Sequence, residues 1–539
     1  MAVLRHFAVV LLLPVLFTTL PAGAELKAQS LVTAGTPPES ATAASDAAAP
    51  AVPASPAARA LEQVLAAAPP PTASDEEKKE AAALAAFYQA RGHEPVWIDA
   101  KGLNATAAAI AAEIGNARAY ALDPRDFALP DLQASVSAAN LSPEASAGAE
   151  IMFSRAILKY ARFARGGRII APSELLSTHL DRRPQLLDPK LVLDEIAASS
   201  EPAAYLAKTN PQHPQFARLR EKYVALTAGS SKPGKAASAE AARLQANMEM
   251  WRWMAPDLGD LYMMANVPEF MIRLVKGGEV VHTERIVAGE TGKQTSIFSR
   301  PLKSIVFRPM WRVPESIKVK ELWPSLIRGG GLFRQYGLEL QTKAGASLDY
   351  HAIDWTKSDI RDYEVVQPPG PRSVLGVVKF TFPSQHTVYM HDTPDKWMFN
   401  SAQRTLSHGC LRLRNPVRMS ELILAEDKGW DAAKIAEVIK GGPLNNEVAL
   451  EKKVRMHITY FTAWVDDAGR LKTYADVYGH EKRVAQALAG KWDQIAKGED
   501  HLAPVQPNKA ALAQTARTPK PQQEEAFADF ISGFLPGGL

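Results

Sequence analysis

Apolar residues recur at helical spacing through residues 75–228. Leu84, Phe87 and Tyr88 lie on one face of a helix, and the same period continues over residues 145–165. Glycine and proline residues punctuate the pattern, as they do between helices. The first large segment of the chain is therefore predicted to be a mostly α-helical domain that spans residues 75–228.

The hydrophobic period changes at Leu261, where β-forming residues begin to dominate. Residues 270–275 and 279–288 are expected to be strands, joined by a turn at Lys276-Gly277-Gly278. A long insertion at about residues 315–370 separates them from later strands. Long loops beside a catalytic strand often act as lids, and a passive insertion is the alternative. We expect an α+β multidomain chain in which a helical domain precedes a β-rich domain.

The chain begins with the layout of an export signal. Arg5 lies in a short polar segment, residues 7–20 are apolar, and Ala22-Gly23-Ala24 forms a small-x-small cleavage site. The apolar run is about 14 residues long, shorter than the roughly 20 that span a bilayer. We expect residues 1–24 to be a signal peptide and the protein to be released into the periplasm. An uncleaved membrane anchor is the alternative.

Three further segments lack the composition of a packed domain. Residues 25–74 are rich in Ala, Pro, Ser and Thr and are expected to be a flexible tether, with a short helix near residues 58–68. Residues 229–243 have the composition of a linker, and the helix that contains Trp251 is expected to pack onto the β-rich domain. Residues 486–539 form a tail whose last apolar residues share one helical stripe. That stripe indicates docking on a partner or on the protein itself, or else a frayed terminus.

The composition of the chain argues against some classes of function and draws attention to one residue. The 62 basic and 58 acidic residues give a net charge of only +4, which is too weak to argue for a nucleic-acid partner. The chain has one cysteine, Cys410, so it contains neither a cysteine zinc cluster nor an internal disulfide. A lone thiol in an exported protein indicates an intermolecular disulfide or a reactive group. The alternative is a buried, unreactive thiol with a structural role only. The collar Ser407-His408-Gly409 favours a nucleophile.

Two histidines could activate this thiol, which when free is only partly ionised at neutral pH. His408 lies two residues before Cys410, where an extended backbone would hold the two side chains apart. His391 ends a separate strand, and strand pairing could bring it within hydrogen-bonding distance. We expect His391 to be the general base, oriented by a main-chain carbonyl near Asp392, with His408 in a supporting role. Gly409 lets the backbone turn so that the N–H groups of Gly409 and Cys410 can face a developing oxyanion.

These residues resemble the signature of a known family. His391, fifteen intervening residues, Ser407-His408-Gly409-Cys410 and Arg412 look like the catalytic motif of the L,D-transpeptidase (YkuD-type) domain. The resemblance covers about residues 80–485 and is to the large YcbB-type subfamily. The further motifs that carry it are Trp251-Arg252-Trp253, Asn266-Val267-Pro268, Phe307-Arg308-Pro309, Trp311-Arg312-Val313-Pro314, Leu375-Gly376, Lys379-Phe380, Phe382-Pro383, His391-Asp392-Thr393-Pro394 and Tyr460-Phe461-Thr462-Ala463-Trp464.

The resemblance implies a helical scaffold domain before a β-rich catalytic domain, which we place at residues 244–485, with a lid-like insertion. It implies that Cys410 attacks the carbonyl of the third residue of a peptidoglycan tetrapeptide stem, usually meso-diaminopimelate, releases D-Ala and forms a thioester. The amine of a second stem would then form a 3→3 cross-link. Tyr389, Ser407 and Arg412 are implied to contact the substrate. The family needs no metal or cofactor, and carbapenem β-lactams are the implied inhibitors.

Two departures from the family pattern and two alternatives accompany this interpretation. Residues 229–243 are too few for the peptidoglycan-binding module that such proteins often carry, and Ser373 stands where Asn is expected. The same catalytic residues would serve a hydrolase that gives the thioester to water. An inactive cell-wall scaffold is the non-enzymatic alternative. The acyl acceptor stays open among a second stem, a free D-amino acid and an amine of an outer-membrane protein.

Overall fold

The computed structural model describes residues 55–99, 101–132, 141–228, 235–508, 510 and 512–514. The expected signal peptide and the apolar stripe at the end of the tail lie outside the described residues. None of the helices in the described ranges combines the length and the apolar character needed to cross a membrane.

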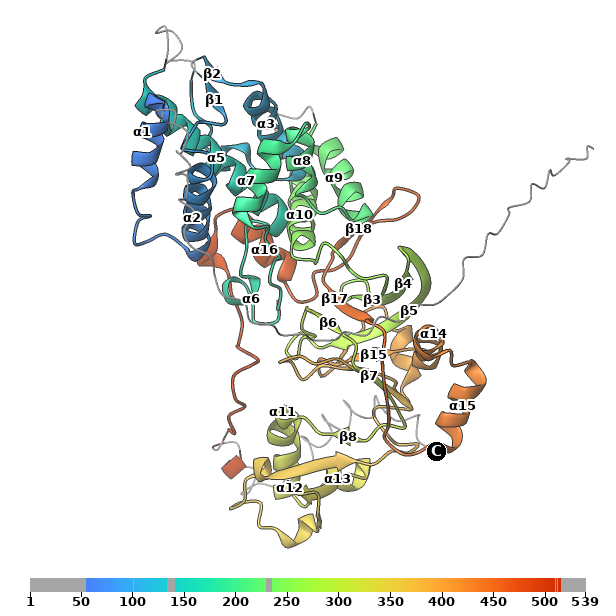
Figure 1. Ribbon diagram of the computed structural model, residues 1–539. Helices are drawn as coiled ribbons and strands as arrows, with labels where there is room; N and C mark the ends of the chain where they lie inside the picture. The colour runs from blue at the N-terminus through green and yellow to red at the C-terminus, as the bar shows by residue number, and fades with distance from the viewer. Residues whose placement is uncertain are drawn as a thin grey trace, which may run out of the picture. The chain divides into compact units, whose positions relative to one another are not determined.

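Helices make up the described chain as far as Arg252, as the sequence predicts (Figure 1). They are α1 (Pro56–Leu65), α2 (Asp75–Gln89), α3 (Ala105–Gly115), α5 (Pro143–Gly166), α6 (Pro172–Leu175), α7 (Pro189–Ala198), α8 (Pro202–Lys208), α9 (Pro214–Thr227) and α10 (Lys235–Arg252), with 3-10 turns η1 (Asn116–Tyr120) and η2 (Pro124–Asp126) and the short hairpin β1 (Ile98–Asp99) and β2 (Gly102–Leu103).

Helix α5 is the centre of the helical core. It starts where the Ser142 side chain accepts the N–H of Ala145, and it ends at Gly167, whose φ of 82° is left-handed. Its buried Glu150 accepts N–H groups of the β1 segment, including that of Ile98 at 2.9 Å. Because a buried carboxylate without partners is costly, this contact holds the hairpin against α5.

Helix α1 lies inside the segment that the sequence assigns to a flexible tether. Its buried residues Ala60 and Leu61 join the same hydrophobic core as α5. The Ser55 side chain caps the helix by accepting the N–H of Ala58 at 3.0 Å. The ordered helical domain therefore includes residues well before Asp75. The short helix expected near residues 58–68 is thus an amphipathic helix of ten residues whose apolar face is buried in the domain core.

The β-rich part is an eleven-stranded mixed sheet, which confirms the α+β class. Its strands are β3 (Leu261–Asn266), β4 (Met271–Lys276), β5 (Glu279–Gly289), β6 (Ser299–Pro301), β7 (Ser304–Phe307), β12 (Val378–Thr381), β13 (Met390–His391), β14 (Thr405–Ser407), β15 (Leu411–Leu413), β16 (Asn446–Ala449) and β17 (Arg455–Thr459), in the spatial order β16-β7-β12-β13-β15-β5-β4-β3-β17-β6, with β14 on β5. The helices that follow are α14 (Pro416–Lys428), α15 (Ala432–Gly441) and α16 (His480–Leu488), with 3-10 turns η6 (Lys396–Asn400) and η7 (Trp492–Gln494). A closing hairpin pairs β18 (Ala463–Val465) with β19 (Leu471–Thr473).

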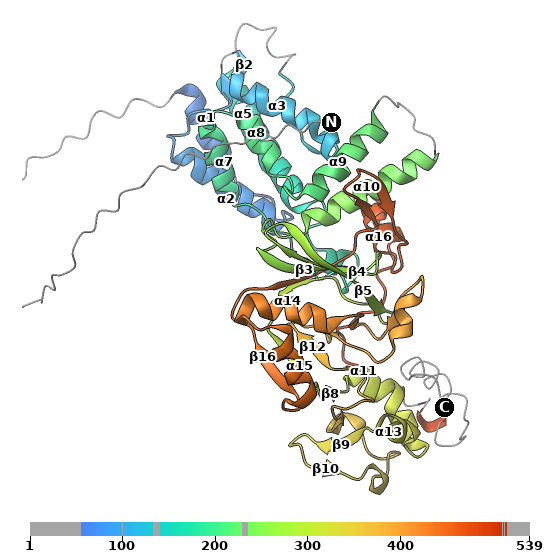
Figure 2. The same ribbon diagram turned by 90° about the vertical axis from the view of Figure 1, so that its right-hand side faces the viewer.

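The insertion has its own small core and sheet (Figure 2). Its elements are β8 (Trp311–Arg312), α11 (Glu315–Ile317), the π-helical turn η3 (Lys318–Leu322), α12 (Trp323–Ile327), α13 (Gly331–Tyr336), β9 (Glu339–Thr342), β10 (Ser347–Leu348), η4 (Tyr350–Ala352), η5 (Ile360–Asp362) and β11 (Tyr363–Gln367), and its sheet order is β10-β9-β11-β8. Val505 and Leu512 of the tail pack against this core. The insertion is thus a folded subdomain with a hydrophobic centre of its own.

Helix α10 joins the helical part to the large sheet. Trp251 stacks on Phe461 with ring centroids 4.4 Å apart, which confirms that this helix packs onto the β-rich domain. The fully buried Asn247 accepts the N–H groups of Thr462 at 2.9 Å and Ala463 at 3.1 Å. Thr462 directly precedes β18 and Ala463 is its first residue, so these contacts join α10 to the closing hairpin and the two stabilise each other.

We predict that Asn247→Ala lowers the free energy of unfolding by about 2–4 kcal/mol, because it leaves two buried N–H groups without an acceptor. Urea unfolding followed by circular dichroism measures this change. Glu240→Ala, at an exposed position of the same helix, is the matched control and should change stability by about 0.5 kcal/mol or less. Equal effects of the two substitutions would contradict a structural role for the Asn247 amide.

Candidate active site

Cys410 is positioned by strand pairing. It immediately precedes β15, which pairs in parallel with β13 so that Arg412 lies opposite His391. The N–H of Leu411 donates to the carbonyl of Tyr389 at 3.1 Å. The structure therefore sets the strand that ends in His391 directly beside the strand that begins after Cys410, although the two residues are far apart in sequence.

The loop that leads into Cys410 is held by short hydrogen bonds. The Ser407 hydroxyl donates to the carbonyl of Cys410 at 2.6 Å and accepts the N–H of Gly409 at 3.2 Å. The Thr295 hydroxyl donates to the carbonyl of Gly409 at 2.8 Å. Gly409 has a φ of +106°, a conformation that few other residues adopt.

These hydrogen bonds distinguish the two N–H groups that the sequence predicts as oxyanion donors. The N–H of Gly409 already donates to the Ser407 hydroxyl in this structure, so we exclude it as an oxyanion donor. The N–H of Cys410 meets no acceptor among the residues that the structure describes. Ser407, which the family resemblance implied as a substrate contact, has its hydroxyl engaged inside the loop.

The Cys410 thiol lies in a partly exposed position, with its sulfur 3.8 Å from the carbonyl oxygen of Thr387. Burial in the protein raises the pKa of this thiol. The N–H of Tyr389 and the positive charges of Arg412 and Lys379 act in the opposite direction without cancelling the rise. The resting nucleophile is therefore a neutral thiol surrounded by groups that favour its anion.

His391 is buried, and its Nδ1 hydrogen-bonds the carbonyl of Asp392. A carbonyl can only accept, so Nδ1 carries the proton and Nε2 is the basic nitrogen. Burial, together with the nearby Arg412 charge, lowers the pKa of His391 to about 3. The expected orienting carbonyl near Asp392 is present and the imidazole is neutral. The role of His391 as general base stays a prediction.

His408 lies in a different environment. Its Nε2 hydrogen-bonds Glu321 at 2.8 Å and also contacts the ammonium group of Lys293, which lies 3.0 Å from the same carboxylate oxygen. Burial would raise the pKa of Glu321, but His408 and Lys293 together lower it. Because Glu321 belongs to the insertion, this cluster ties the insertion to the catalytic loop.

Tyr389 and Arg412 both lie close to the thiol. The charge on Cys410 and the burial of the ring raise the pKa of the Tyr389 hydroxyl, which also receives a hydrogen bond from Trp311. Arg412 is buried with one guanidinium nitrogen 3.9 Å from Asp395. Burial raises the pKa of Asp395 to about 7 and lowers that of Arg412 to about 10.

Two residues of this site, Lys293 and Glu321, carry no signal in the sequence. They come from a turn after β5 and from the insertion, and no motif spacing connects them to Cys410. Trp311 and Lys379 belong to motifs of the resemblance, Trp311-Arg312-Val313-Pro314 and Lys379-Phe380, but no role was assigned to either residue. Within the described ranges, no group of three His, Cys, Asp or Glu side chains is placed to hold a metal ion.

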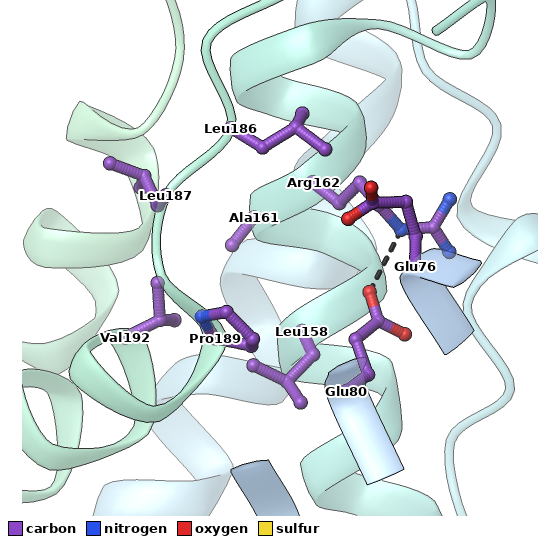
Figure 3. A pocket seen from close by; sticks show the side chains of 9 residues that line it. All are labelled: Glu76, Glu80, Leu158, Ala161, Arg162, Leu186, Leu187, Pro189 and Val192. Carbon is purple, nitrogen blue, oxygen red and sulfur yellow. Dashed lines mark hydrogen bonds and ion pairs between the residues drawn. The ribbon is translucent and has the colours of Figure 1, made fainter. Parts of the chain in front are cut away.

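A small cavity in the helical part is a separate feature (Figure 3). Apolar side chains including Leu158 and Val192 line it, together with an ion pair in which Arg162 lies 2.8 Å from Glu80. None of its lining residues belongs to the catalytic strands. We attribute it to helix packing rather than to substrate binding.

Comparison with known families agrees with this geometry. Residues 260–444 match the L,D-transpeptidase catalytic domain (YkuD), and residues 82–222 match the scaffold domain. A Haemophilus influenzae protein named "Putative L,D-transpeptidase" is 26% identical over 233 residues, which cover 43% of this chain and 47% of that protein. The aligned region thus spans about half of the relative. The resemblance inferred from the sequence is confirmed: this chain carries a YkuD-type L,D-transpeptidase catalytic domain preceded by a scaffold domain.

We predict that Gly289→Ala slows acylation of Cys410 by about tenfold to a hundredfold, since small displacements of a reacting group have effects of this size. A Cβ at this position would lie 2.1 Å from the carbonyl oxygen of Lys293 and 2.8 Å from the Cα of Gly409, so the catalytic loop must shift. The rate of carbapenem adduct formation, followed by intact mass, measures the effect. Gly292→Ala, whose Cβ would meet nothing within 4 Å, should react like the wild type. Equal rates for all three proteins would contradict this steric coupling.

We predict that the alkylation rate of Cys410 rises throughout the neutral range, with a midpoint above the value of about 8.5 for a free thiol. Burial raises the pKa of this thiol, so only a small fraction is thiolate at pH 7 and each step up in pH increases it. Iodoacetamide labelling from pH 5 to 10, read by mass spectrometry, reports this group alone because the chain has one cysteine. N-acetylcysteine run in parallel is the control. A rate that is constant between pH 5 and 8 would instead indicate a resting thiolate–imidazolium pair.

Proposed function

We propose that this protein is a periplasmic L,D-transpeptidase that joins peptidoglycan stems through a Cys410 thioester. The observation that carries the proposal is the parallel pairing of β13 with β15, which sets a neutral, carbonyl-oriented His391 beside the Cys410 strand. The match of residues 260–444 to the L,D-transpeptidase catalytic domain supports the reaction class. The signal-peptide layout of residues 1–24 supports export.

Acylation starts with proton transfer from Cys410 Sγ to His391 Nε2. Sγ attacks the carbonyl carbon of the third stem residue, and the resulting oxyanion accepts a hydrogen bond from the N–H of Cys410. Collapse of this intermediate breaks the bond to D-Ala, whose amine takes the proton from His391. Arg412 and Lys379 stabilise the sulfur while it carries negative charge, since both lower the pKa of the thiol. The product is a thioester on Cys410.

Deacylation repeats these roles with an amine as the nucleophile. The side-chain amine of a second stem attacks the thioester carbon and loses a proton by way of His391. The C–S bond breaks, an amide forms between two meso-diaminopimelate residues, and the thiol is restored by the same proton. Water in place of the amine would give a tripeptide by hydrolysis. Tyr389 and Arg412, which flank the thiol, are the side chains that we propose contact the donor stem.

The decisive experiment incubates the chain from Glu25 onward with tetrapeptide muropeptides and separates the products by mass. We expect release of D-Ala and cross-linked dimers, and a carbapenem adduct that is absent from Cys410→Ala. Tripeptides alone would assign the protein to the hydrolases. The absence of both products and adduct from the wild type would overturn an enzymatic function.

The two histidines provide the matched comparison in this assay. His391→Ala should lower the rate by about 10²–10⁴-fold, the usual contribution of a general base. His408→Ala should cost less, because the Nε2 of His408 bonds Glu321 of the insertion. Equal losses in both variants would transfer part of the base role to His408. Circular dichroism checks that both variants are folded.

A further inference from the structure

Lys379 is a half-buried cation at the active site with no carboxylate partner. It lies on β12, directly opposite His391 in the pairing with β13. Its ammonium nitrogen lies 4.7 Å from the centre of the Tyr389 ring. In the described part of the chain, no Asp or Glu oxygen lies within ion-pair distance of this nitrogen. Burying a charge without a counter-ion is unfavourable, so a partner from outside the chain is expected.

A second cation increases this local excess of positive charge. Arg312 is exposed on β8 and makes no ion pair with any described carboxylate, and its charge lowers the pKa of Lys379 in addition to the larger effect of burial. Glu447 raises the pKa of Lys379 by its charge alone, without an ion pair. The carboxylate of Glu447 instead accepts the Ser304 hydroxyl at 2.7 Å. Lys379 next to the thiol and Arg312 near Lys379 are thus two like charges that no described carboxylate pairs directly, and together they form a site for an anion.

Arg412 provides the contrast that singles out Lys379. Its guanidinium group lies 3.9 Å from the buried carboxyl of Asp395, so the fold supplies a neighbour for that charge. Lys379 faces the same thiol and has only the face of an aromatic ring. Of these two cations, Lys379 is therefore the one with the greater capacity to bind a carboxylate.

We propose that Lys379, assisted by Arg312, binds the terminal carboxylate of the donor stem and so selects stems that end one residue beyond the scissile bond. This inference rests on the proposed function. The carboxylate of a terminal D-Ala lies about 4 Å, one residue length, from the carbonyl carbon that Cys410 attacks. A stem with one more residue would carry its carboxylate a further residue length away, beyond the ammonium group. Lys379 thus acts as a specificity-determining residue for tetrapeptide donors.

A cycle of two proteins and two donors tests this assignment. The proteins are the wild type and Lys379→Met, and the donors are a tetrapeptide stem with a free terminal carboxylate and the same stem with a terminal amide. Release of the leaving residue gives kcat/KM for each pair. We expect amidation to cost the wild type about tenfold to a hundredfold, the value of a charge-assisted hydrogen bond. Lys379→Met should lose as much with the free carboxylate and nothing further on amidation.

Other outcomes would overturn the assignment. Additive losses would show that Lys379 does not contact the terminal carboxylate. Equal losses of Lys379→Met on both donors, with an alkylation midpoint shifted to higher pH, would limit Lys379 to stabilising the thiolate. A third donor, amidated on the side-chain carboxylate of its third residue, gives one more outcome. If the losses are non-additive only with this donor, Lys379 binds that side-chain carboxylate instead. Lys379→Arg should recover part of the rate, and Lys303→Met, at an exposed lysine, should match the wild type.

A binding measurement separates this inference from the proposed function. In a Cys410→Ser background the Kd of each donor requires no turnover, and calorimetry gives it directly. The free-carboxylate donor should bind about tenfold or more tightly than its amide, and Lys379→Met should abolish that difference. If the wild type forms no thioester, the proposed function fails while this comparison still tests Lys379. If the wild type is active and the two donors bind equally, only the role of Lys379 is overturned.

Discussion

The parallel pairing of β13 with β15 is the contact on which the catalytic arrangement depends. Each strand is short, and each is held in register by a longer neighbour, β12 on one side and β5 on the other. Within this register His391 lies opposite Arg412, which puts Cys410 at the entrance of the same strand pair. Gly289, the last residue of β5, lies so close to Gly409 that a Cβ on Gly289 would clash with the Gly409 backbone. Loss of this approach would separate nucleophile and base without unfolding the sheet.

The electrostatics of the site favour a nucleophile that is activated only when it reacts. Burial keeps both the thiol and the imidazole neutral, because it raises the pKa of Cys410 and lowers that of His391. Two cations nevertheless face the sulfur, so the charge that appears during proton transfer is stabilised where it forms. This state also protects the one thiol of the chain, since a neutral thiol is less readily oxidised than a thiolate.

The sequence could predict those features that depend on local period or on a spaced motif. The helices up to Arg252 follow from such signals, including the short helix expected near residues 58–68, which is observed as α1. The pairing of the strand that ends in His391 with the strand after Cys410 agrees with the spaced motif. His386 stacks on Phe298 and bonds His501 of the tail. The sequence placed α1 in a flexible tether because its composition resembles a linker, whereas its buried face joins the core that contains α5.

Lys379 lies in a motif of the resemblance and His408 was expected to support the site, but the charge environment of Lys379 and the contact of His408 with Glu321 were beyond prediction for another reason. Their roles depend on which charges lie nearby, and those neighbours come from segments that are distant in sequence. A lysine on an alternating strand looks the same whether it faces solvent or a catalytic thiol. Only the register of β12 against His391 distinguishes the two cases.

The insertion and the catalytic loop are linked through partly buried charged groups. Glu321 bonds His408 on the loop and Lys293 on the turn that follows β5, so one carboxylate contacts both segments that enclose Gly409. The tail adds a second restraint, because Val505 and Leu512 pack on the insertion core while His501 bonds His386, next to the Thr387 carbonyl that faces the thiol. Movement of the insertion away from the sheet would therefore break a partly buried ion pair and expose apolar surface at once, and both costs oppose it. Glu321 of the insertion bonds His408, which directly precedes Gly409 and Cys410, so the position of the insertion and the geometry of the loop before the thiol are coupled.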